Sequence, residues 1–571
     1  ADPTEKEYVV RYLSGPSFPG IGEKSALNIV EKYGSDVIEK IKNDPEMKLR
    51  VSGISQNKLD QLKEVILSEN PMDAIVTFLN THGITGQNMT RIMSHYQEEA
   101  QVLIEANPYR MMEEISGIGF ATCDKIGLAL GFEKDDPIRI TALMNHKFQE
   151  LCYKPGHSFI FKSTLFKGMP PFDAELLEAA FQTLIDSKTL ILDEERLYHH
   201  TQYDAEVFVS KFLKSRQKPL YDLSLADFDE KMEHIEQSLA LKFDETQRSA
   251  IETFLKNDVM ILTGGPGTGK STLLSGLVML FIKNYPELHI SLCAPTGRAA
   301  KRLEDLTNVH ASTVHSILKW NPDTNEFGFH ETNPLETDIL IVDEFSMVDI
   351  WVLSKLLKAS SQVMKVLFVG DQDQLPSVGP GFVLKDLLDS KVFPIISLSY
   401  NYRQIEGSEV IDLALNVNDG IFEVDHYHKD VKFFDTKLYP GVESILKIVK
   451  EARDRGYSIF DIQVLAPVYR GSLGIDNLNY WLQKAFNPES KTKRSIQFGN
   501  RIFREGDKIL QLKNQPDDFV YNGDIGILIE IDDDKNVLVD FEGTYVSYAS
   551  GDLINITHAY CMSVHKSQGS E

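Results

Sequence analysis

A glycine-rich segment in the middle of the chain constrains the fold more than any other feature. Residues 264–272 read GGPGTGKST; they follow an apolar run, 259–262, and precede a helix-forming stretch, 273–281. A glycine loop between a strand and a helix turns backbone N–H groups toward phosphate, so the segment predicts an α/β core that binds ATP or GTP. A purely structural glycine turn is the alternative, which this context disfavours. The residues expected at the nucleotide are Gly265, Gly267, Thr268, Gly269, Lys270, Ser271 and Thr272, with the Ser271 hydroxyl on Mg²⁺.

Two further apolar runs end in polar residues. Residues 339–342 run into Asp343 and Glu344, and residues 366–369 run into the segment 370–376, GDQDQLP. Buried parallel strands present their carboxyl ends at one edge of the sheet, where ligands bind. Asp343 is therefore expected to hold Mg²⁺, and Glu344 to polarise the attacking water. An acidic helix start is the alternative for this pair, and the third strand disfavours it.

The motifs of residues 236–571 resemble, in order, those of superfamily 1 helicases. The segment 370–376 resembles motif III, and residues 564–571, VHKSQGSE, resemble motif V. The variants DEFS at 343–346 and VHKSQG are most similar to the RecD-like enzymes of superfamily 1B, and the stretch 464–488 resembles their stand-alone branch. The other matches are the Q motif at 244–247, motif Ia at 294–300, motif Ib at 313–318 and motif IV at 401–404.

This resemblance implies an ATP-dependent DNA helicase that moves 5′ to 3′ on single-stranded DNA, in repair or recombination. Gln247 would read adenine, which favours ATP over GTP. Gln374 and Arg403 would contact the γ-phosphate and, with Lys270 and Glu344, form the catalytic set. Gly569 and Glu571 would meet the nucleotide from the second lobe. The residues expected along the strand are Pro295, Thr296, Arg298, His315, His565 and Lys566.

The first 135 residues contain a repeat. Gly-Ile recurs at positions 20, 53, 83 and 117, and apolar residues at helical spacing follow each pair. The repeat resembles the helix-hairpin-helix module, in which a Gly-x-Gly turn points N–H groups at a DNA phosphate. Only two copies keep both glycines, so phosphate binding is predicted there, and four purely structural copies are the alternative. The predicted binding residues are Gly20, Gly22, Gly117 and Gly119; Ser55 and Thr85 replace the second glycine in the other copies.

Two hairpins are predicted inside the helicase-like region. Turn residues flanked by aromatics at 320–329 predict the first, which in RecD-like relatives is a pin that splits the duplex, here with Phe327 and Phe329. The strands 508–512 and 525–529 flank Asn522-Gly523 and predict the second. In this family that segment resembles a small SH3-like barrel.

We therefore expect a multidomain α/β protein. Two RecA-like P-loop lobes are preceded by an all-α helix-hairpin-helix region, and a small SH3-like β insertion lies in the second lobe. The chain stops before a motif VI arginine, so we expect a truncated part of a longer protein rather than a weak ATPase. The predicted boundaries are 1–145 for the repeats, 146–235 for a winged-helix-like connector, 236–390 for lobe 1A with its pin at about 319–335, 391–500 for lobe 2A, 501–551 for the insertion 2B, and 552–571 for the return to lobe 2A.

Composition limits the partners. No apolar run approaches the roughly 20 residues of a membrane span, and the four cysteines form no Cys-x-x-Cys pair, which favours a cytoplasmic protein. The net charge of −25 opposes nucleic-acid binding except at local basic clusters such as 298–302. The expected partners are single-stranded DNA and single/double-strand junctions. The alternatives are an RNA helicase and a nucleotide-gated junction binder that does not unwind; the repeats favour DNA.

Overall fold

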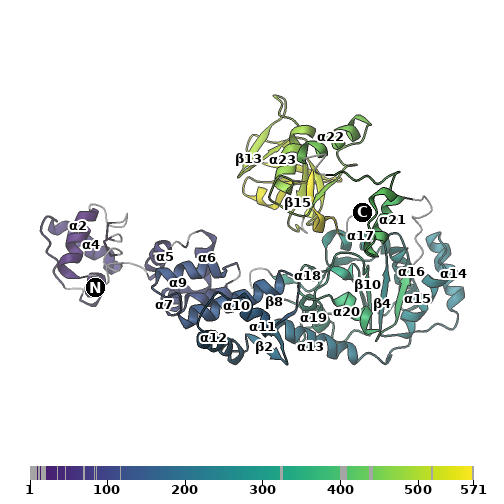
Figure 1. Cartoon of the computed structure of the whole chain (residues 1–571), viewed down its shortest axis with the longest axis horizontal. Helices are drawn as coiled ribbons and strands as arrows, with labels where there is room; N and C mark the ends of the chain where they lie inside the picture. The colour runs from purple at the N-terminus through teal and green to yellow at the C-terminus, as the bar shows by residue number, and fades with distance from the viewer. Residues whose placement is uncertain are drawn as a thin grey trace. The chain divides into compact units, whose positions relative to one another are not determined.

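The computed structural model describes residues 9–10, 13–14, 21–34, 36–44, 47–68, 71–82, 84, 86–115, 117–321, 326–398, 408–435, 441–515 and 518–568 (Figure 1). The chain forms two compact units. The first comprises residues 1–151 and 161–190, and the second comprises 152–160 and 191–571. In the part of the chain that is described, no helix is long and apolar enough to cross a membrane.

The repeats of the first unit are helical, as their spacing predicts. Each Gly-Ile pair is followed by one helix: α2 (Glu23–Tyr33), α4 (Gln56–Ser68), α6 (Gln87–Tyr96) and α9 (Phe120–Ala129). Each helix buries its apolar stripe because side chains three and four positions apart share one face. The buried positions include Ala26, Ile29, Leu59, Leu62, Ile92, Cys123 and Ile126.

A helix-strand-helix-helix-hairpin segment follows, in the order of a winged helix. It contains α10 (Pro137–Tyr153), β1 (Phe159–Phe161), α11 (Lys162–Gly168), α12 (Ala174–Asp186), β2 (Leu190–Asp193) and β3 (Arg196–His199). The strands lie in the order β1-β3-β2, so β2 and β3 are neighbours in this small sheet.

Lobe 1A is built on a six-stranded sheet in the order β11-β4-β10-β9-β5-β6. All its pairs are parallel. The strands are β4 (Val259–Gly264), β5 (Ile290–Ala294), β6 (Ala311–Thr313), β9 (Ile339–Val342), β10 (Lys365–Gly370) and β11 (Ile395–Leu398).

Helices cover both faces of this sheet, and the sequence shows why (Figure 1). Val259 and Ile261 of β4 belong to one core cluster, whereas Met260 and Leu262 belong to another. A strand buried on both faces needs a continuous apolar run, because successive side chains point to opposite sides. The helices are α13 (His200–Lys214), α14 (Phe228–Leu239), α15 (Glu245–Lys256), α16 (Lys270–Asn284), α17 (Gly297–Thr307), α19 (Ile350–Ala359) and α20 (Val383–Ser390).

The C-terminal part combines a parallel strand pair with an antiparallel sheet. Strand β12 (Val464–Ala466) pairs in parallel with β20 (Cys561–Ser563), beside α22 (Gly441–Asp454) and α23 (Ile475–Phe486). The antiparallel sheet has the order β18-β17-β16-β15-β19, and β13 (Ser495–Phe498) and β14 (Arg501–Arg504) form a separate hairpin. Its strands are β15 (Lys508–Gln511), β16 (Ile525–Ile531), β17 (Val537–Phe541), β18 (Thr544–Tyr548) and β19 (Ile556–His558).

The predicted antiparallel pairing of the two strands that flank Asn522-Gly523 is confirmed, and the connection between them is long. Strand β15 pairs with β16 through Leu510↔Ile525, so residues 512–524 form a long connection. The local turn at its end is closed by Asp524, whose carboxylate accepts the Tyr521 N–H at 2.7 Å, while Gly523 adopts a φ of 103°. A side chain that bonds its own backbone two or three residues away makes such a turn without strand pairing.

A buried carboxylate joins the antiparallel sheet to the parallel pair. Asp507 accepts hydrogen bonds from Gln483 Nε2 at 2.6 Å, Asn487 Nδ2 at 2.8 Å and the Tyr560 hydroxyl at 2.9 Å. Burial alone would raise the pKa of Asp507, but these bonds and His558 hold it below its usual value. A buried charge with this many donors fixes the elements around it, because losing one donor leaves the charge uncompensated.

Candidate functional site

The glycine loop after β4 has the backbone that phosphate binding requires. Gly267 and Gly269 adopt φ values of 75° and 87°, which other residues rarely adopt. A side chain at Gly264 would place its Cβ 2.7 Å from the Leu398 carbonyl oxygen and 2.7 Å from Thr268 Oγ1. Gly269 caps α16 without a side-chain hydrogen bond, so the first N–H groups of that helix face the loop.

Lys270 and three carboxylates meet at the C-terminal edge of the sheet. The Lys270 ammonium donates to the carbonyl oxygens of Gly264 at 2.5 Å and Gly265 at 2.9 Å. Burial lowers the pKa of Lys270, and the charges of Asp371, Glu344 and Asp343 oppose that shift. The predicted convergence of β4, β9 and β10 therefore occurs. Asp371, which is 3% exposed, was missed, although its position directly after β10 marked it.

The two acidic residues after β9 are held differently. Asp343 accepts the Glu344 N–H at 2.8 Å, and Glu344 adopts a φ of 49°, which is strained for a side chain of its size. Burial raises the pKa of Asp343. Burial, and then the neighbouring Asp343, raises the pKa of Glu344 to about 7. A carboxylate with such a pKa can accept a proton near neutral pH.

One residue of the basic cluster 298–302 also acts on this edge. Burial raises the pKa values of Asp343 and Glu344, and the charge of Arg302 on α17 opposes that rise. Burial lowers the pKa of Lys270, and the charge of Arg302 adds to that fall. Its helix begins at the edge of the sheet, so its second turn can face the nucleotide loop. Sequence position beside motif Ia alone did not reveal this.

The donor set fits a magnesium–triphosphate rather than a free metal ion. Nowhere in the described chain do three His, Cys, Asp or Glu side chains form a group able to hold a metal. Mg²⁺ is usually held by one or two protein oxygens together with substrate phosphates and water. Ser271 and Asp343 are the two expected protein ligands, and the open glycine loop beside them suits the phosphates.

Two glutamines predicted at the nucleotide have different surroundings. The Gln374 amide bonds Asp371, and its Oε1 is buried with no partner among the described residues. Gln247 is 2% exposed and closes the capping box of α15: its N–H donates to Asp244, and its Oε1 accepts the Asp244 N–H at 3.1 Å. The structure thus gives Gln247 a capping role, and adenine readout stays a prediction. Arg403, Gly569 and Glu571 lie outside the described residues.

A cavity of about 190 Å³ opens beside the nucleotide edge. Pro295, His315 and Gln568 line it, together with residues 347–349 and 376–379. Burial lowers the pKa of His315, so this ring meets a ligand as a neutral group. Thr296 uses its hydroxyl oxygen to cap α17, accepting the Ala299 N–H at 3.2 Å. The cavity gathers residues of motifs Ia, Ib, III and V, together with residues that follow the DEFS segment.

The connection between β15 and β16 reaches two of the predicted strand-binding segments. The Tyr521 side chain lies against Gly297, where a Cβ would stand 2.5 Å from the ring. The Lys566 ammonium donates to Asn522 Oδ1 at 2.5 Å. His565 is exposed beside it. No sequence signal linked residues 521 and 522 to motifs Ia and V.

The predicted pin is a hairpin whose aromatic residues pack at its base. Strands β7 (Trp320–Asn321) and β8 (Glu326–Phe327) pair through Trp320↔Phe327, and the ring centroids of these residues are 4.5 Å apart. The ring centroids of Phe327 and Trp351 are also 5.7 Å apart. Phe327 and Phe329 both pack against one core cluster of lobe 1A. The tip, 322–325, is outside the described residues. A wedge role for Phe327 and Phe329 stays a prediction, but their packing favours support of the hairpin.

The Gly-Ile turns of the repeats show why two copies differ from the others. Gly53 and Gly117 both adopt a φ of 86°, so the first glycine shapes the turn in a copy with one glycine and in a copy with two. At the second position, Gly22 and Gly119 have φ values of −84° and −103°, and a Cβ there would meet no described residue within 4 Å. Neither the backbone nor packing against the described residues requires these glycines.

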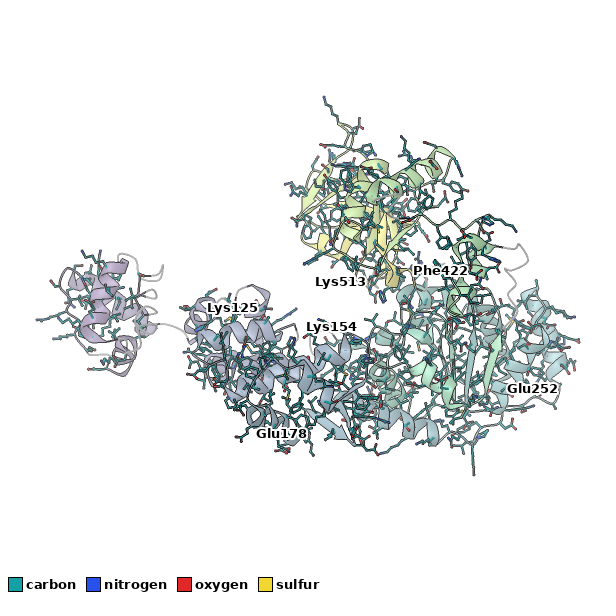
Figure 2. All side chains as sticks on the ribbon, in the orientation of Figure 1. Lys125, Lys154, Glu178, Glu252, Phe422 and Lys513 are labelled. Atoms are coloured by element: carbon teal, nitrogen blue, oxygen red, sulfur yellow. The ribbon has the colours of Figure 1, made fainter. Side chains whose placement is uncertain are left out.

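Positive charge accompanies the open turn of the fourth copy. The Arg91 guanidinium reaches the Gly117 turn, where an added Cβ would stand within contact distance of it. Lys125 lies on α9, which begins directly after Gly119, and its side chain is exposed (Figure 2). Gly20 lies outside the described residues.

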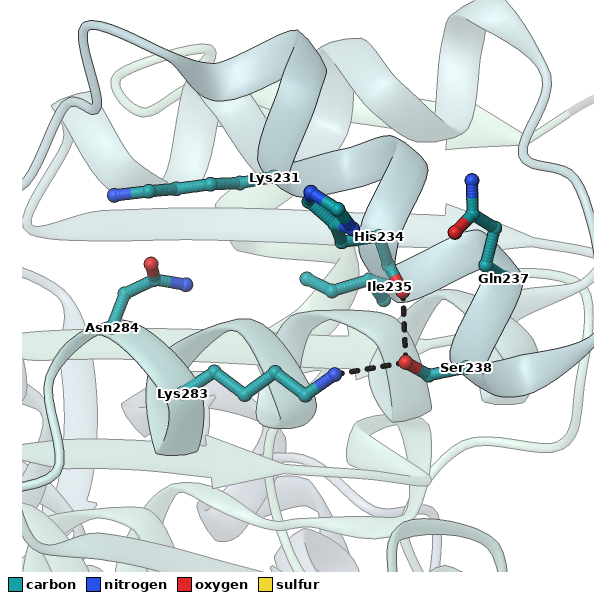
Figure 3. A pocket seen from close by; sticks show the side chains of 7 residues that line it. All are labelled: Lys231, His234, Ile235, Gln237, Ser238, Lys283 and Asn284. Atoms are coloured by element: carbon teal, nitrogen blue, oxygen red, sulfur yellow. Dashed lines mark hydrogen bonds between the residues drawn. The ribbon is translucent and has the colours of Figure 1, made fainter.

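Another cavity is remote from the nucleotide loop. Lys231, His234, Lys283 and Asn284 are among the residues that surround about 510 Å³ between α14 and the end of α16 (Figure 3). Helix α16 has 15 residues, so Asn284 lies roughly 20 Å from the P-loop that begins this helix. The Lys283 ammonium donates to Ser238 Oγ at 2.8 Å. This cavity is separate from the nucleotide site.

Three family models match the chain. They are the ATP-dependent RecD2 DNA helicase HHH domain at residues 68–159, an AAA domain at 247–380, and the ATP-dependent RecD-like DNA helicase SH3 domain at 478–541. The ATP-dependent RecD2 DNA helicase of Deinococcus radiodurans is 30% identical over 570 residues, which cover 97% of this chain and 77% of the relative. The RecBCD enzyme subunit RecD of Mycolicibacterium smegmatis is 30% identical over 366 residues, covering 57% of this chain and 64% of the relative.

Solved structures of Pif1 helicases align with part of the chain. The Pif1 helicase from Candida albicans aligns with a TM-score of 0.38 and 20% identity, over 58% of this chain and 86% of the other. Bacteroides Pif1 bound to ssDNA aligns with a TM-score of 0.36 and 21% identity, over 58% and 84%.

Proposed function

Because the chain belongs to the ATP-dependent RecD2 DNA helicases, we propose that it moves 5′ to 3′ on single-stranded DNA and opens single/double-strand junctions in DNA repair or recombination. ATP hydrolysis coupled to DNA unwinding is the activity of this family. The direction, the junction preference, Mg²⁺ and the roles of single residues are parts of the proposal.

One observation carries the proposal: two loops serve both the nucleotide edge and the neighbouring cavity. After β9, Asp343 and Glu344 face Lys270, and residues 347–349 line the cavity three residues later. After β10, Asp371 faces Lys270, and residues 376–379 line the same cavity. A shift of either loop on the nucleotide side must therefore move the cavity wall, because close-packed loops do not deform independently.

The residues of the nucleotide edge divide the chemistry among them. The N–H groups of the glycine loop and the Lys270 ammonium bind and orient the phosphates. Ser271 and Asp343 would hold Mg²⁺, which would supply positive charge against the phosphate oxygens. Glu344 accepts the proton of the attacking water. Gln374, whose buried Oε1 has no partner among the described residues, would respond to the γ-phosphate and pass the change into the loop after β10.

The open glycines of the repeats support junction binding. Gly22 and Gly119 leave free space in front of backbone N–H groups, which is what a DNA phosphate needs and what the fold itself does not need. Such contacts carry no sequence preference, so they suit the duplex arm of any junction. The strand itself would occupy the cavity lined by His315 in lobe 1A.

Unwinding assays with tailed duplexes test the proposal. A duplex with a 5′ single-stranded tail should be unwound in the presence of ATP and Mg²⁺, a 3′-tailed duplex should not, and single-stranded DNA should stimulate ATP turnover. Unwinding only from a 3′ tail would contradict the direction. Equal or better unwinding of a duplex with an RNA tail would indicate an RNA helicase instead of a DNA helicase. ATP turnover without unwinding of either tailed duplex would indicate a nucleotide-gated junction binder.

A further inference from the structure

We propose that the loop of residues 467–474, here called the Tyr469 loop, is a second strand-binding element, in which Arg470 binds a phosphate and Tyr469 stacks on a base. The ligand is single-stranded DNA. The inference rests on the proposed strand track and extends it to a segment of lobe 2A that lies outside all the helicase motifs assigned above.

Strand pairing places this loop beside motif V. Strand β12 pairs in parallel with β20, with Val464 opposite Cys561 and Ala466 opposite Ser563. The residues after Ala466 and the residues after Ser563 therefore leave the sheet at the same edge, one strand apart, about 5 Å. The second segment contains His565 and Lys566, which are expected to contact the strand. A strand held by motif V thus runs within reach of the Tyr469 loop.

The loop is held in one conformation by its own backbone. The N–H of Ile475 donates to the Val468 carbonyl at 3.0 Å, and the N–H of Asp476 donates to the Tyr469 carbonyl at 3.2 Å. Gly471 adopts a φ of 103°, and a Cβ at Gly474 would stand 2.5 Å from the Tyr469 carbonyl oxygen. Both glycines are thus required for the fold of the loop. A loop fixed in this way presents its side chains at little entropic cost to binding.

The fixed backbone points its large side chains outward. Val468 is 54% exposed and Tyr469 is 56% exposed. Arg470 is also exposed, and it forms no ion pair with any residue that the structure describes. Here the loop uses its glycines and backbone for the fold and leaves the tyrosine and the arginine available.

The chemistry of the pair selects single-stranded nucleic acid. A tyrosine ring stacks on a base face, and base faces are accessible only where the strand is unpaired. A guanidinium beside it can bind a backbone phosphate in a bidentate manner. In a chain with a net charge of −25, Arg470, which forms an ion pair with no residue that the structure describes, is a local site where phosphate is not repelled.

Binding of a fluorescent oligo-dT to the full chain tests the proposal, measured by anisotropy over a series of salt concentrations. Arg470→Ala should lower the affinity and reduce the slope of log K against log salt by about 0.7, the value for one phosphate on a single strand. Tyr469→Ala should lower the affinity roughly tenfold on oligo-dT, which is within the range for losing one stacked base. It should have no such effect on an abasic strand of equal length.

The chain offers a matched control on the other side of β12. Tyr457 is 55% exposed and Arg455 is exposed, and both precede the strand. Arg455→Ala with Tyr457→Ala should bind oligo-dT like the wild type. Tyr469→Phe should restore stacking and Arg470→Lys should restore the salt slope, whereas a folding defect would not respond to these substitutions. Melting temperatures equal to that of the wild type confirm that the alanine variants fold.

The outcomes separate this inference from the proposed function. If Lys566→Ala weakens oligo-dT binding while Arg470→Ala and Tyr469→Ala bind like the control, the Tyr469 loop is not part of the track and the inference fails alone. If Lys566→Ala also binds like the wild type, the assumed track beside motif V is wrong. An equal loss for Tyr469→Ala on oligo-dT and on the abasic strand overturns base stacking.

Discussion

Two regions of this protein are proposed to offer backbone N–H groups to phosphate, and they use glycine for different reasons. In lobe 1A, a Cβ at Gly264 would stand 2.7 Å from the Leu398 carbonyl oxygen, so the packing of the lobe itself excludes a side chain. In the repeats, a Cβ at Gly22 or Gly119 would meet no described residue within 4 Å, and the φ values suit any residue. Here packing against the described residues does not require the glycine, and both glycines are helix N-caps, where glycine is common.

The difference teaches how each site depends on the fold. The nucleotide loop is part of a buried sheet edge, where strain at Glu344 and desolvation of Lys270 tune the chemistry. A change in the packing of the nucleotide loop therefore affects the stability of lobe 1A and ATP turnover together. The repeat turns lie on the surface of small helical units, so function there can be removed while the fold remains. The predictions below test this contrast, starting with the largest expected effect.

Glu344→Gln should reduce ATP turnover by roughly 10²–10⁴-fold, the contribution of a positioned general base, because an amide cannot accept the proton. ATP binding should remain, since the glycine loop and Lys270 are unchanged. Steady-state turnover and nucleotide binding measure the two effects. Turnover close to the wild-type rate would place the base elsewhere on the sheet edge.

Lys270→Ala should reduce turnover by roughly 10²–10³-fold, the scale for removing one electrostatic group from a preorganised site. Binding of single-stranded DNA without nucleotide should remain, because the cavity lined by His315 is built from other residues. DNA binding by anisotropy, beside turnover, checks this separation. Loss of both would show that the nucleotide edge and the cavity cannot be altered independently.

Gly264→Ala and Gly119→Ala compare the two kinds of glycine directly. Gly264→Ala should lower the free energy of unfolding of lobe 1A by about 1–3 kcal/mol, the cost of overpacking a close-packed site. Gly119→Ala should stay within about 0.5 kcal/mol of the wild type, like other surface substitutions. Thermal or denaturant melting gives both values. Equal destabilisation would remove the contrast between the regions.

Phe327→Ala with Phe329→Ala tests whether the hairpin aromatics act in chemistry or in packing. Both rings are partly buried against the core of lobe 1A, so the double variant should lose about 1–3 kcal/mol of stability, less than a fully buried pair would. Unwinding should fall further than DNA-stimulated ATPase if the hairpin also separates strands. An equal fall of the two activities would leave the hairpin as core structure only.

The smallest expected effect concerns the repeats. Gly22→Val with Gly119→Val should block two phosphate contacts, lower the salt slope of junction binding by roughly two units, and leave the melting temperature unchanged. Affinity for a short single-stranded tail should barely change. Ser55→Val with Thr85→Val is the control at turns with one glycine and should leave the salt slope alone. The same drop in both double variants would refute the distinction between the copies.

Local sequence patterns predicted much of this architecture. Continuous apolar runs such as 259–262 suit a strand that is buried on both faces. Polar residues follow each run, and because the strands are parallel, these residues come together at one edge of the sheet. The Gly-Ile spacing likewise predicted the four repeat helices, because their apolar positions are fixed by the helical period. These features depend on residues that are close together in the sequence, so the sequence alone is enough to predict them.

Contacts between distant residues decided other features. Asn522-Gly523 indicated the hairpin of β15 and β16, but the local sequence did not show that Asp524 closes a turn at the end of a long connection. Gln247 belongs to the capping box of α15, and its Nε2 also donates to the Gly269 carbonyl at 3.5 Å, so adenine readout stays a prediction. In both cases a polar group had several chemically suitable partners, and composition cannot rank them.

The sequence by itself determined the nucleotide loop, the polar residues that follow each buried strand, and the difference between repeat turns with one glycine and with two. Each of these is a short segment whose chemistry follows from its own residues. Only the tertiary structure decided that Asp371 and Arg302 act on the same edge as Lys270, that Phe327 packs at the base of its hairpin, and that the space before Gly119 is empty. Burial, electrostatic neighbours and free space depend on segments far apart in the chain, and they exist only once the chain has folded.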